Sequence, residues 1–142
     1  MRNFDFGILG FINILTPLVL KNKTKDFGLR IIKMADSLPN TRSANVIANQ
    51  ILRSATSVGA NYRSACRASS KADFISKITV VEEEADETLF WLEIIHEAGL
   101  MKFNRLESLL KEADELVAIF TSSGKTAKLN NPKPANRNPR SR

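Results

Sequence analysis

Glu93 and His96 come nearest to a metal-binding pattern, because residues three apart share one face of a helix. Carboxylate-bridged di-iron bundles use such a Glu-x-x-His pair, but they need a second pair and two further inward carboxylates. The chain has a single histidine, so the second pair is missing. Its single cysteine, Cys66, excludes an intramolecular disulfide and a cysteine-based zinc site. We therefore predict no bound metal and no cofactor.

Gly124, Lys125 and Thr126 resemble the end of a phosphate-binding P-loop. That motif needs a glycine at position 119, which is Ile119, and it lies between a strand and a helix. Here a helix is predicted before the three residues and a proline-rich stretch follows them. Cys66 and the serines have no histidine at a spacing recognisable for nucleophilic catalysis. We predict no catalytic residues and no enzyme, and no polar cluster supports a small-molecule site in the core.

Two stripes of opposite charge occupy consecutive predicted helices. The arginines of the first, which has no acid between Thr41 and Ala72, fall within an arc of about 80° at 100° per residue. The acids of the second fall within about 60°. The two stripes are Arg42, Arg53, Arg63 and Arg67, and Glu82, Asp86, Glu93 and Glu97. The interpretation we favour is ion pairing, within the chain or between subunits; a phosphate-binding arginine row and a solvated face are the alternatives.

Four stretches carry apolar residues at alternating spacings of three and four, which is typical of amphipathic helices. We expect helices over 24–38, from Thr41 or Ser43 to about 67, from Ser69 or Ser70 to Gly99, and from Asn104 to Gly124. No stretch shows the alternation of a strand. Because short connections join antiparallel neighbours, the sequence predicts an all-α, antiparallel up-and-down four-helix bundle over residues 24–124.

Residues 1–23 precede the predicted bundle as an extension of uncertain structure. The apolar run from Gly7 to Leu20 is interrupted by Pro17 and is shorter than the roughly 20 residues that span a bilayer. Asp5 and the lack of a small-x-small cleavage site argue against a signal peptide. An extra segment outside the domain, packing on the bundle or a neighbour, and a membrane-surface role remain open. We expect no membrane-spanning segment and a cytoplasmic protein.

The last residues, 125–142, form a basic tail that we expect to be disordered. They contain no acid and several prolines, and too little apolar surface to offset the entropy of ordering. The rest of the chain carries equal numbers of basic and acidic residues, so the formal net charge of +6 comes from this tail. Its basic residues are Lys125, Lys128, Lys133, Arg137, Arg140 and Arg142.

Several residues of the two central helices are predicted to serve packing. A glycine such as Gly59 lowers the stability of a helix by roughly 1 kcal/mol compared with alanine. The close approach of another backbone would offset this cost. Tyr62, Trp91 and Leu92 lie at helical spacing, where aromatic and aliphatic side chains are more often core or interface than a platform for nucleic-acid bases. We therefore assign these four residues to helix or subunit packing.

Three motifs carry a resemblance to a known family: QILRSATSVGANYR at 50–63, SKADFISK at 70–77 and EADETLFWL at 84–92. Over about residues 24–128 the chain resembles the four helix bundle protein family, also called the 23S rRNA-intervening-sequence proteins, found in insertions within bacterial large-subunit ribosomal RNA genes. It is similar, more distantly, to the accessory variability determinant of diversity-generating retroelements, a basic pentamer thought to bind nucleic acid and a reverse transcriptase. The matching motif positions are Arg53, Ser57, Gly59, Asn61, Tyr62, Glu87, Trp91 and Leu92.

The resemblance implies a left-handed antiparallel bundle that assembles as a ring-shaped homopentamer, and it implies no catalytic residue. Ser64 stands where family members commonly have an acid, which leaves the basic stripe less compensated. The function we predict is a non-enzymatic bacterial assembly protein that associates with RNA or DNA through the tail and Arg53, Arg63 and Arg67. The alternative is a protein-interaction scaffold whose charged faces serve only subunit and partner docking.

Overall fold

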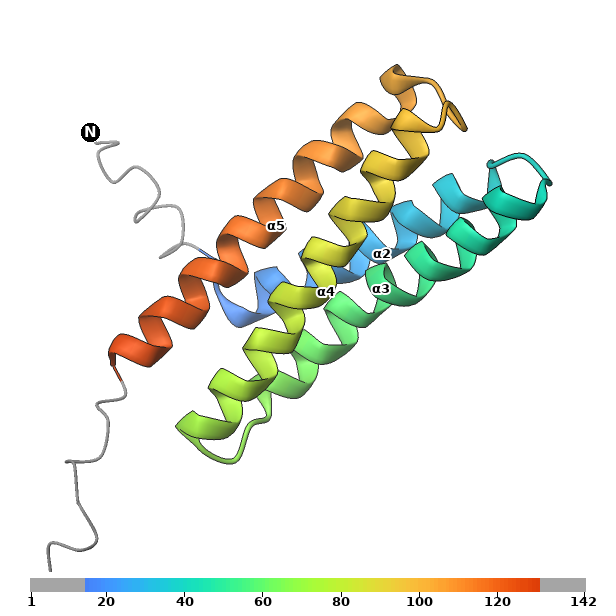
Figure 1. Ribbon diagram of the computed structural model, residues 1–142. Helices are drawn as coiled ribbons and strands as arrows, with labels where there is room; N and C mark the ends of the chain where they lie inside the picture. Colours follow the sequence, from blue (N-terminus) through green and yellow to red (C-terminus); the bar gives the residue numbers. More distant parts are fainter. Residues whose placement is uncertain (1–14, 131–142) are drawn as a thin grey trace, which may run out of the picture.

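The computed structural model describes residues 15–130, which form four helices packed side by side (Figure 1). They are α2 (Pro17–Asp36), α3 (Arg42–Cys66), α4 (Lys71–Glu97) and α5 (Phe103–Leu129). Each runs antiparallel to the helix before it, and residues 15–130 contain no strand. The predicted all-α, up-and-down four-helix bundle is confirmed.

Local capping signals explain where α3 and α4 begin and where α4 ends. Thr41 accepts a hydrogen bond from the Ala44 amide at 3.2 Å, and Ser70 accepts one from the Asp73 amide at 3.0 Å. Asp73 in turn bonds Lys77 and the Ser69 amide, and these contacts lower the pKa of its carboxyl. Gly99 takes φ of +69° after α4, the left-handed conformation that suits glycine at a helix end.

The first helix begins at Pro17, earlier than the predicted boundary at residue 24. Thr16 caps it by accepting a hydrogen bond from the Val19 amide at 3.2 Å, and proline is well suited to the first turn because its missing N–H needs no partner there. Leu20, one turn on, is buried against the core. Residues 17–20 therefore belong to the bundle, whereas residues 1–14 lie outside the described part of the chain.

The last helix is longer than predicted at both ends. Lys102, not Asn104, flanks its first turn, and no side chain caps it. Gly124 does not end it: this glycine is buried, and a Cβ there would lie 3.6 Å from the Ile78 side chain. Lys125 and Lys128 therefore lie on α5 and not in the tail that the sequence predicts for them. The other predicted tail residues, Lys133, Arg137, Arg140 and Arg142, lie outside residues 15–130.

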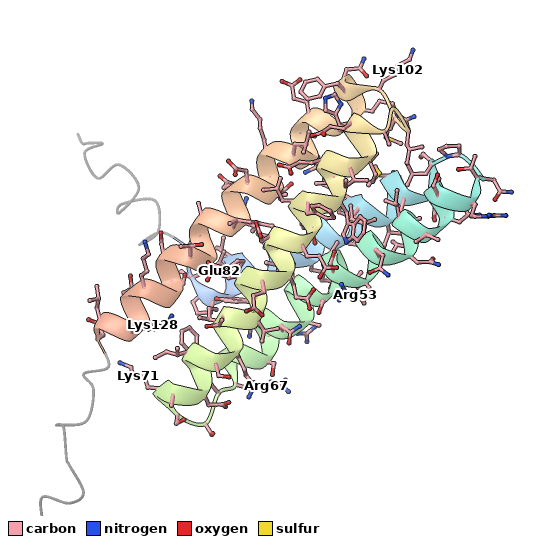
Figure 2. The ribbon with its side chains drawn as sticks, in the orientation of Figure 1. Arg53, Arg67, Lys71, Glu82, Lys102 and Lys128 are labelled. Atoms are coloured by element: carbon pink, nitrogen blue, oxygen red, sulfur yellow. The ribbon has the colours of Figure 1, made fainter. Side chains whose placement is uncertain are left out.

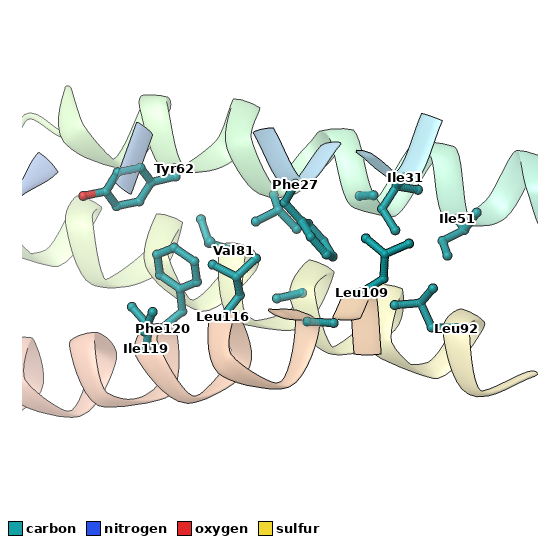
Figure 3. Packing of buried hydrophobic residues seen from close by; sticks show 14 of the residues in the cluster. Phe27, Ile31, Ile51, Tyr62, Val81, Leu92, Leu109, Leu116, Ile119 and Phe120 are labelled. Atoms are coloured by element: carbon teal, nitrogen blue, oxygen red, sulfur yellow. The ribbon is translucent and has the colours of Figure 1, made fainter. Parts of the chain in front are cut away.

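The core is a continuous layer of aliphatic and aromatic side chains between the helices (Figure 3). Tyr62 is buried there with its ring centroid 5.4 Å from that of Phe120. Leu92 is fully buried as well. The largest fully buried side chains are Phe27, Phe120, Ile31, Ile51, Ile78, Leu92, Ile95, Leu106 and Leu116.

The two seams that α2 forms differ in character. Against α3 it packs closely: a Cβ on Gly59 would lie 3.4 Å from Thr24 Oγ1 and 3.6 Å from the Lys25 amide nitrogen. Against α5 it forms ion pairs, including Lys23 with Glu115 at 2.9 Å and Arg30 with Glu112. Exposed pairs of this kind contribute about 0–1 kcal/mol each. The α2–α3 seam is therefore the tightly packed one.

Replacing Gly59 by leucine should overpack the α2–α3 seam and lower the free energy of unfolding by at least about 1–3 kcal/mol, measured by urea denaturation. Gly28→Ala on α2 is the matched control. A Cβ at Gly28 meets nothing nearer than 3.7 Å, so alanine should fit and stabilise the helix by up to about 1 kcal/mol. Equal stability of Gly59→Leu and wild type would contradict close packing at Gly59.

Candidate nucleic-acid interface

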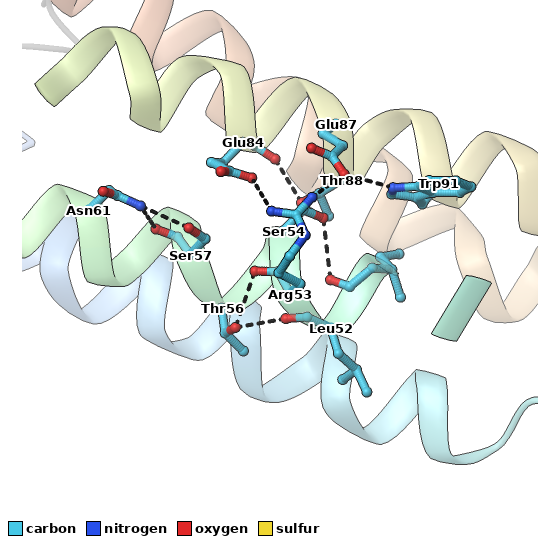
Figure 4. A network of polar contacts seen from close by, with 11 residues as sticks. Leu52, Arg53, Ser54, Thr56, Ser57, Asn61, Glu84, Glu87, Thr88 and Trp91 are labelled. Carbon is cyan, nitrogen blue, oxygen red and sulfur yellow. Dashed lines mark hydrogen bonds and ion pairs between the residues drawn. The ribbon is translucent and has the colours of Figure 1, made fainter. Parts of the chain in front are cut away.

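Arg53 of α3 is held by two glutamates of α4 (Figure 4). Its Nη1 lies 3.2 Å from Glu84 Oε1, and its Nη2 donates to Glu87 Oε2. The same Glu87 oxygen accepts a hydrogen bond from Trp91 Nε1 at 3.1 Å. We call these four residues the α3–α4 clamp. The guanidinium of Arg53 is thus bound by two carboxylates of the same chain.

The clamp shifts the titration of both partners in the direction that favours their charged forms. The hydrogen bond with Glu87 raises the pKa of Arg53 above its usual value. The same bond, followed by that from Trp91, holds the pKa of Glu87 below its usual value. Beneath the clamp, Thr88 Oγ1 donates to Ser54 Oγ at 2.9 Å, a buried hydroxyl pair that joins the two helices.

Of the predicted basic stripe, Arg53 is the residue that pairs with acids of α4, and it does so at this clamp. Within residues 15–130, no ion pair joins Arg42, Arg63 or Arg67 to an acid. Of the predicted acidic stripe, Glu82 instead accepts a hydrogen bond from Thr121 of α5 at 2.8 Å. The favoured ion-pairing interpretation therefore holds within the chain for Arg53, through Glu84 and Glu87 rather than through the stripe itself.

Exposed basic side chains gather at one end of the bundle, where α2 and α4 begin and α3 and α5 end (Figure 2). Acids are scarce in these segments: Asp73 is paired with Lys77, and Asp26 directly follows Lys25 on α2. Lys71 also donates to the Asn130 carbonyl at 3.2 Å, which ties α4 to the end of α5. We call this surface the basic end; it consists of Lys25, Arg63, Arg67, Lys71, Lys125 and Lys128.

The sequence did not predict this separation of charge, because counting the basic and acidic residues of the predicted bundle does not show where along the helices they lie. Equal totals hide a separation, since the acids of α4 other than Asp73 lie beyond Val81 and those of α5 lie before Leu116. One signal was available: no acid follows Glu115 in the chain. Because α3 and α5 run in the same direction and end at the same end of the bundle, that acid-free stretch lies at the same end as Arg63 and Arg67.

The remaining predicted site residues lie away from the basic end or inside the bundle. Trp91 is half-buried, with Phe90 edge-on to its ring at a centroid distance of 4.9 Å. Burial raises the pKa of the Tyr62 hydroxyl, and a hydrogen bond with Cys66 adds to this effect. Gly59 lies against α2, and Leu92 lies in the core.

Neither metal-binding residues nor a membrane span is found in the described part of the chain. Residues 15–130 contain no group of three or more His, Cys, Asp or Glu side chains that could hold a metal ion. Glu93 is exposed, and the ring of His96 lies against Phe103 at 5.0 Å instead. Over the same residues, no helix combines the length and the apolar character needed to cross a bilayer.

Bundle, clamp and basic end together define a small all-α protein built on an antiparallel four-helix scaffold. The family model of the 23S rRNA-intervening sequence protein matches residues 17–122, and the chain belongs to this family. The resemblance noted from the sequence motifs is therefore confirmed. Residues 1–16 and 123–142 lie outside this match.

A solved structure supports the same assignment. The chain is similar to a protein of unknown function from the S23 ribosomal protein family of Bacteroides thetaiotaomicron, whose crystal structure was determined at 1.70 Å resolution. The two share 37% sequence identity and a TM-score of 0.71, and the likeness covers 77% of this chain and 97% of that one. A comparison with proteins of curated function finds no match.

The clamp predicts a pH-dependent contribution to stability. Glu87→Gln should lower the free energy of unfolding at neutral pH, because it removes the carboxylate that Arg53 and Trp91 bind. Folding lowers the pKa of Glu87. The difference in unfolding free energy between wild type and variant is therefore fully present at a pH above the usual glutamate pKa of about 4.3, and it disappears as the pH falls through the lowered pKa of the folded state. Urea denaturation from pH 7 to pH 3, followed by circular dichroism, measures it.

Asp86→Asn is the control for this series, since Asp86 is exposed and forms no ion pair with a described residue. It should leave the unfolding free energy nearly unchanged at every pH. A Glu87→Gln effect of the same size at pH 7 and pH 3 would show that the clamp contributes by packing and not by charge.

Proposed function

We propose that this protein binds the phosphate backbone of RNA or DNA through its basic end and the residues that follow it, and that it does so without catalysing a reaction. The observation that carries the proposal is the separation of charge along the bundle. The basic end passes directly into residues 131–142, where Lys133, Arg137, Arg140 and Arg142 are the only charged residues. Such a concentration of positive charge attracts polyanions and releases their counterions on binding.

The attraction comes from side chains and not from helix dipoles. Two helices begin and two end at this face, so their dipoles largely cancel. Arg63 lies in the last turn of α3, and Arg67, four residues on, is the residue that caps the end of this helix, so both side chains extend from the same end of α3. A guanidinium presents paired N–H donors that match phosphate oxygens, so these two arginines are the expected phosphate ligands within the bundle.

Arg53 has a different role in this proposal. Its guanidinium is bound by Glu84 and Glu87, and a phosphate would have to displace both carboxylates. We therefore assign Arg53 to the clamp between α3 and α4 and place phosphate binding on Arg63, Arg67, Lys125, Lys128 and the residues after 130.

We also propose that the protein self-associates, as the family resemblance implies for a homopentameric ring. Large apolar side chains remain exposed on single chains, among them Val46 at 55% and Phe90 at 48%. In a closed ring with the helices along its axis, cyclic symmetry would place every basic end on one face. Several weak phosphate contacts would then act together on one nucleic-acid strand.

A protein-interaction scaffold is the second candidate function. The observation in its favour is the exposed acidic side of α4, where Asp86 and Glu93 flank the half-exposed Phe90 and pair with no basic residue of 15–130. An apolar side chain ringed by like charges suits a basic protein partner. In this case, the charged surfaces serve subunit and partner docking, and no nucleic acid binds.

Binding of a fluorescent single-stranded RNA as a function of salt separates the two functions. Arg63→Glu combined with Arg67→Glu should weaken binding at least tenfold at 50 mM salt. Removing residues 131–142 should reduce the slope of log affinity against log salt by about 0.7 for each phosphate that these residues neutralise. The matched control, Lys102→Glu combined with Arg105→Glu, makes the same change of charge at the other end of the bundle and should have a small effect.

Two results would contradict the proposed function. The absence of RNA and DNA binding at about 50 mM salt, where phosphate contacts are strong, would leave the scaffold as the supported function. Equal losses of affinity in the two double variants would mean that net charge, and not the basic end, governs the binding.

The molar mass of the purified chain in solution tests the assembly. Light scattering after size exclusion should give five times the 15.8 kDa of one chain for the proposed pentamer. Val46→Glu should reduce this mass if the exposed apolar side chains form the contacts between subunits. A mass equal to one chain at micromolar concentration would contradict self-association.

A further inference from the structure

A shallow apolar groove runs between α2 and α3, and its lining includes Lys25 and Arg63 of the basic end. Its volume is about 280 Å³. Its floor is low because Gly28 and Gly59 carry no side chain and Thr56 and Ala60 carry small ones. Leu29 forms one wall and is 54% exposed. Nothing within residues 15–130 covers the groove.

We propose that the chain's own first residues, 1–14, dock into this groove. The segment reads MRNFDFGILGFINI, and more than half of its residues are large and apolar. Such a sequence gains free energy by leaving water, and this groove offers apolar surface close to where the segment joins the bundle. The proposal is independent of nucleic-acid binding.

Residues 1–14 join the bundle close enough to this groove to reach it. The segment joins the bundle at Leu15, and the groove lining begins at Lys21, just over one helical turn beyond the Thr16 cap. Along α2 the lining extends to Ile32, a distance of roughly 17 Å at 1.5 Å per residue. Fourteen residues reach about 46 Å when extended and about 21 Å as a helix, so the segment is long enough in either form.

The tether also favours this segment over a second copy of the chain. A covalently attached segment is present at an effective concentration of the order of millimolar, whatever the protein concentration. Leu15, the first described residue, already packs against the core, so the chain approaches the bundle before α2 begins. Docking therefore requires only that the chain turn back along α2 at residues 15 and 16.

Thiol reactivity in the full-length chain tests the proposal. In a Cys66→Ser background, Leu29→Cys places one thiol on the groove wall, and its rate of modification by a maleimide reports whether the groove is covered. We expect at least tenfold slower modification than in the same protein carrying Phe4→Asp, Ile8→Asp and Phe11→Asp. Val80→Cys is the matched control, because Val80 is 36% exposed on α4 and does not line the groove. Its rate should be the same with either N-terminal sequence.

Each other outcome overturns the proposal. Rapid modification of Leu29→Cys in both proteins would show that the groove is open. Slow modification that survives the three aspartates would show that something else, such as a second copy, covers it. Protection that disappears on dilution would assign the occupant to a neighbouring chain. Circular dichroism of the aspartate variant confirms that the bundle is intact in the comparison.

Discussion

The close approach of α2 to α3 is the contact on which the described features depend. Gly59 brings the α3 backbone within van der Waals distance of Thr24, whose hydroxyl is satisfied by the Leu20 carbonyl at 2.8 Å. A larger side chain at Gly59 would push the two helices apart. The groove would then lose its floor, and Arg63, one turn further along α3, would no longer line the edge of the groove near the basic end.

Polar pairing between α3 and α4 fixes how these two helices are aligned along their length. The buried Ser54–Thr88 pair leaves no hydroxyl unsatisfied, since Ser54 accepts from Thr88 and itself donates to the Ile51 carbonyl at 3.3 Å. Arg53 adds a contact at the surface that only Glu84 and Glu87 can satisfy at this alignment. Because the acids of α4 other than Asp73 lie beyond Val81, the same alignment places Arg63 and Arg67 beside the part of α4 where acids are scarce.

The sequence predicted well those features that depend on local signals. Thr41, Ser70 and Gly99 set helix ends through their own hydrogen bonds or backbone conformation, and each has the expected role. Pro17 and Gly124 were misread because either residue can end a helix or lie within one, and only the tertiary packing decides. Packing decides both cases. Leu20 anchors the first turns of α2, so Pro17 begins this helix, and Ile78 packs on Gly124, so α5 continues through it. The basic end could not be predicted from composition, since it arises when distant segments meet.

The kind of recognition that the basic end can support follows from what surrounds it. Reading a base requires hydrogen bonds to its edge or an exposed aromatic ring on which it stacks. Within residues 15–130, the phenylalanine, tyrosine and tryptophan rings with the greatest exposure are those of Phe90 and Phe103, which are about half exposed and lie toward the opposite end of the bundle, and Tyr62 is buried. Without such a platform, the contacts expected of the lysine and arginine side chains are mainly to phosphate groups, which carry no sequence information. The proposed interface is therefore suited to nucleic acid of any sequence, with salt concentration as the main determinant of affinity.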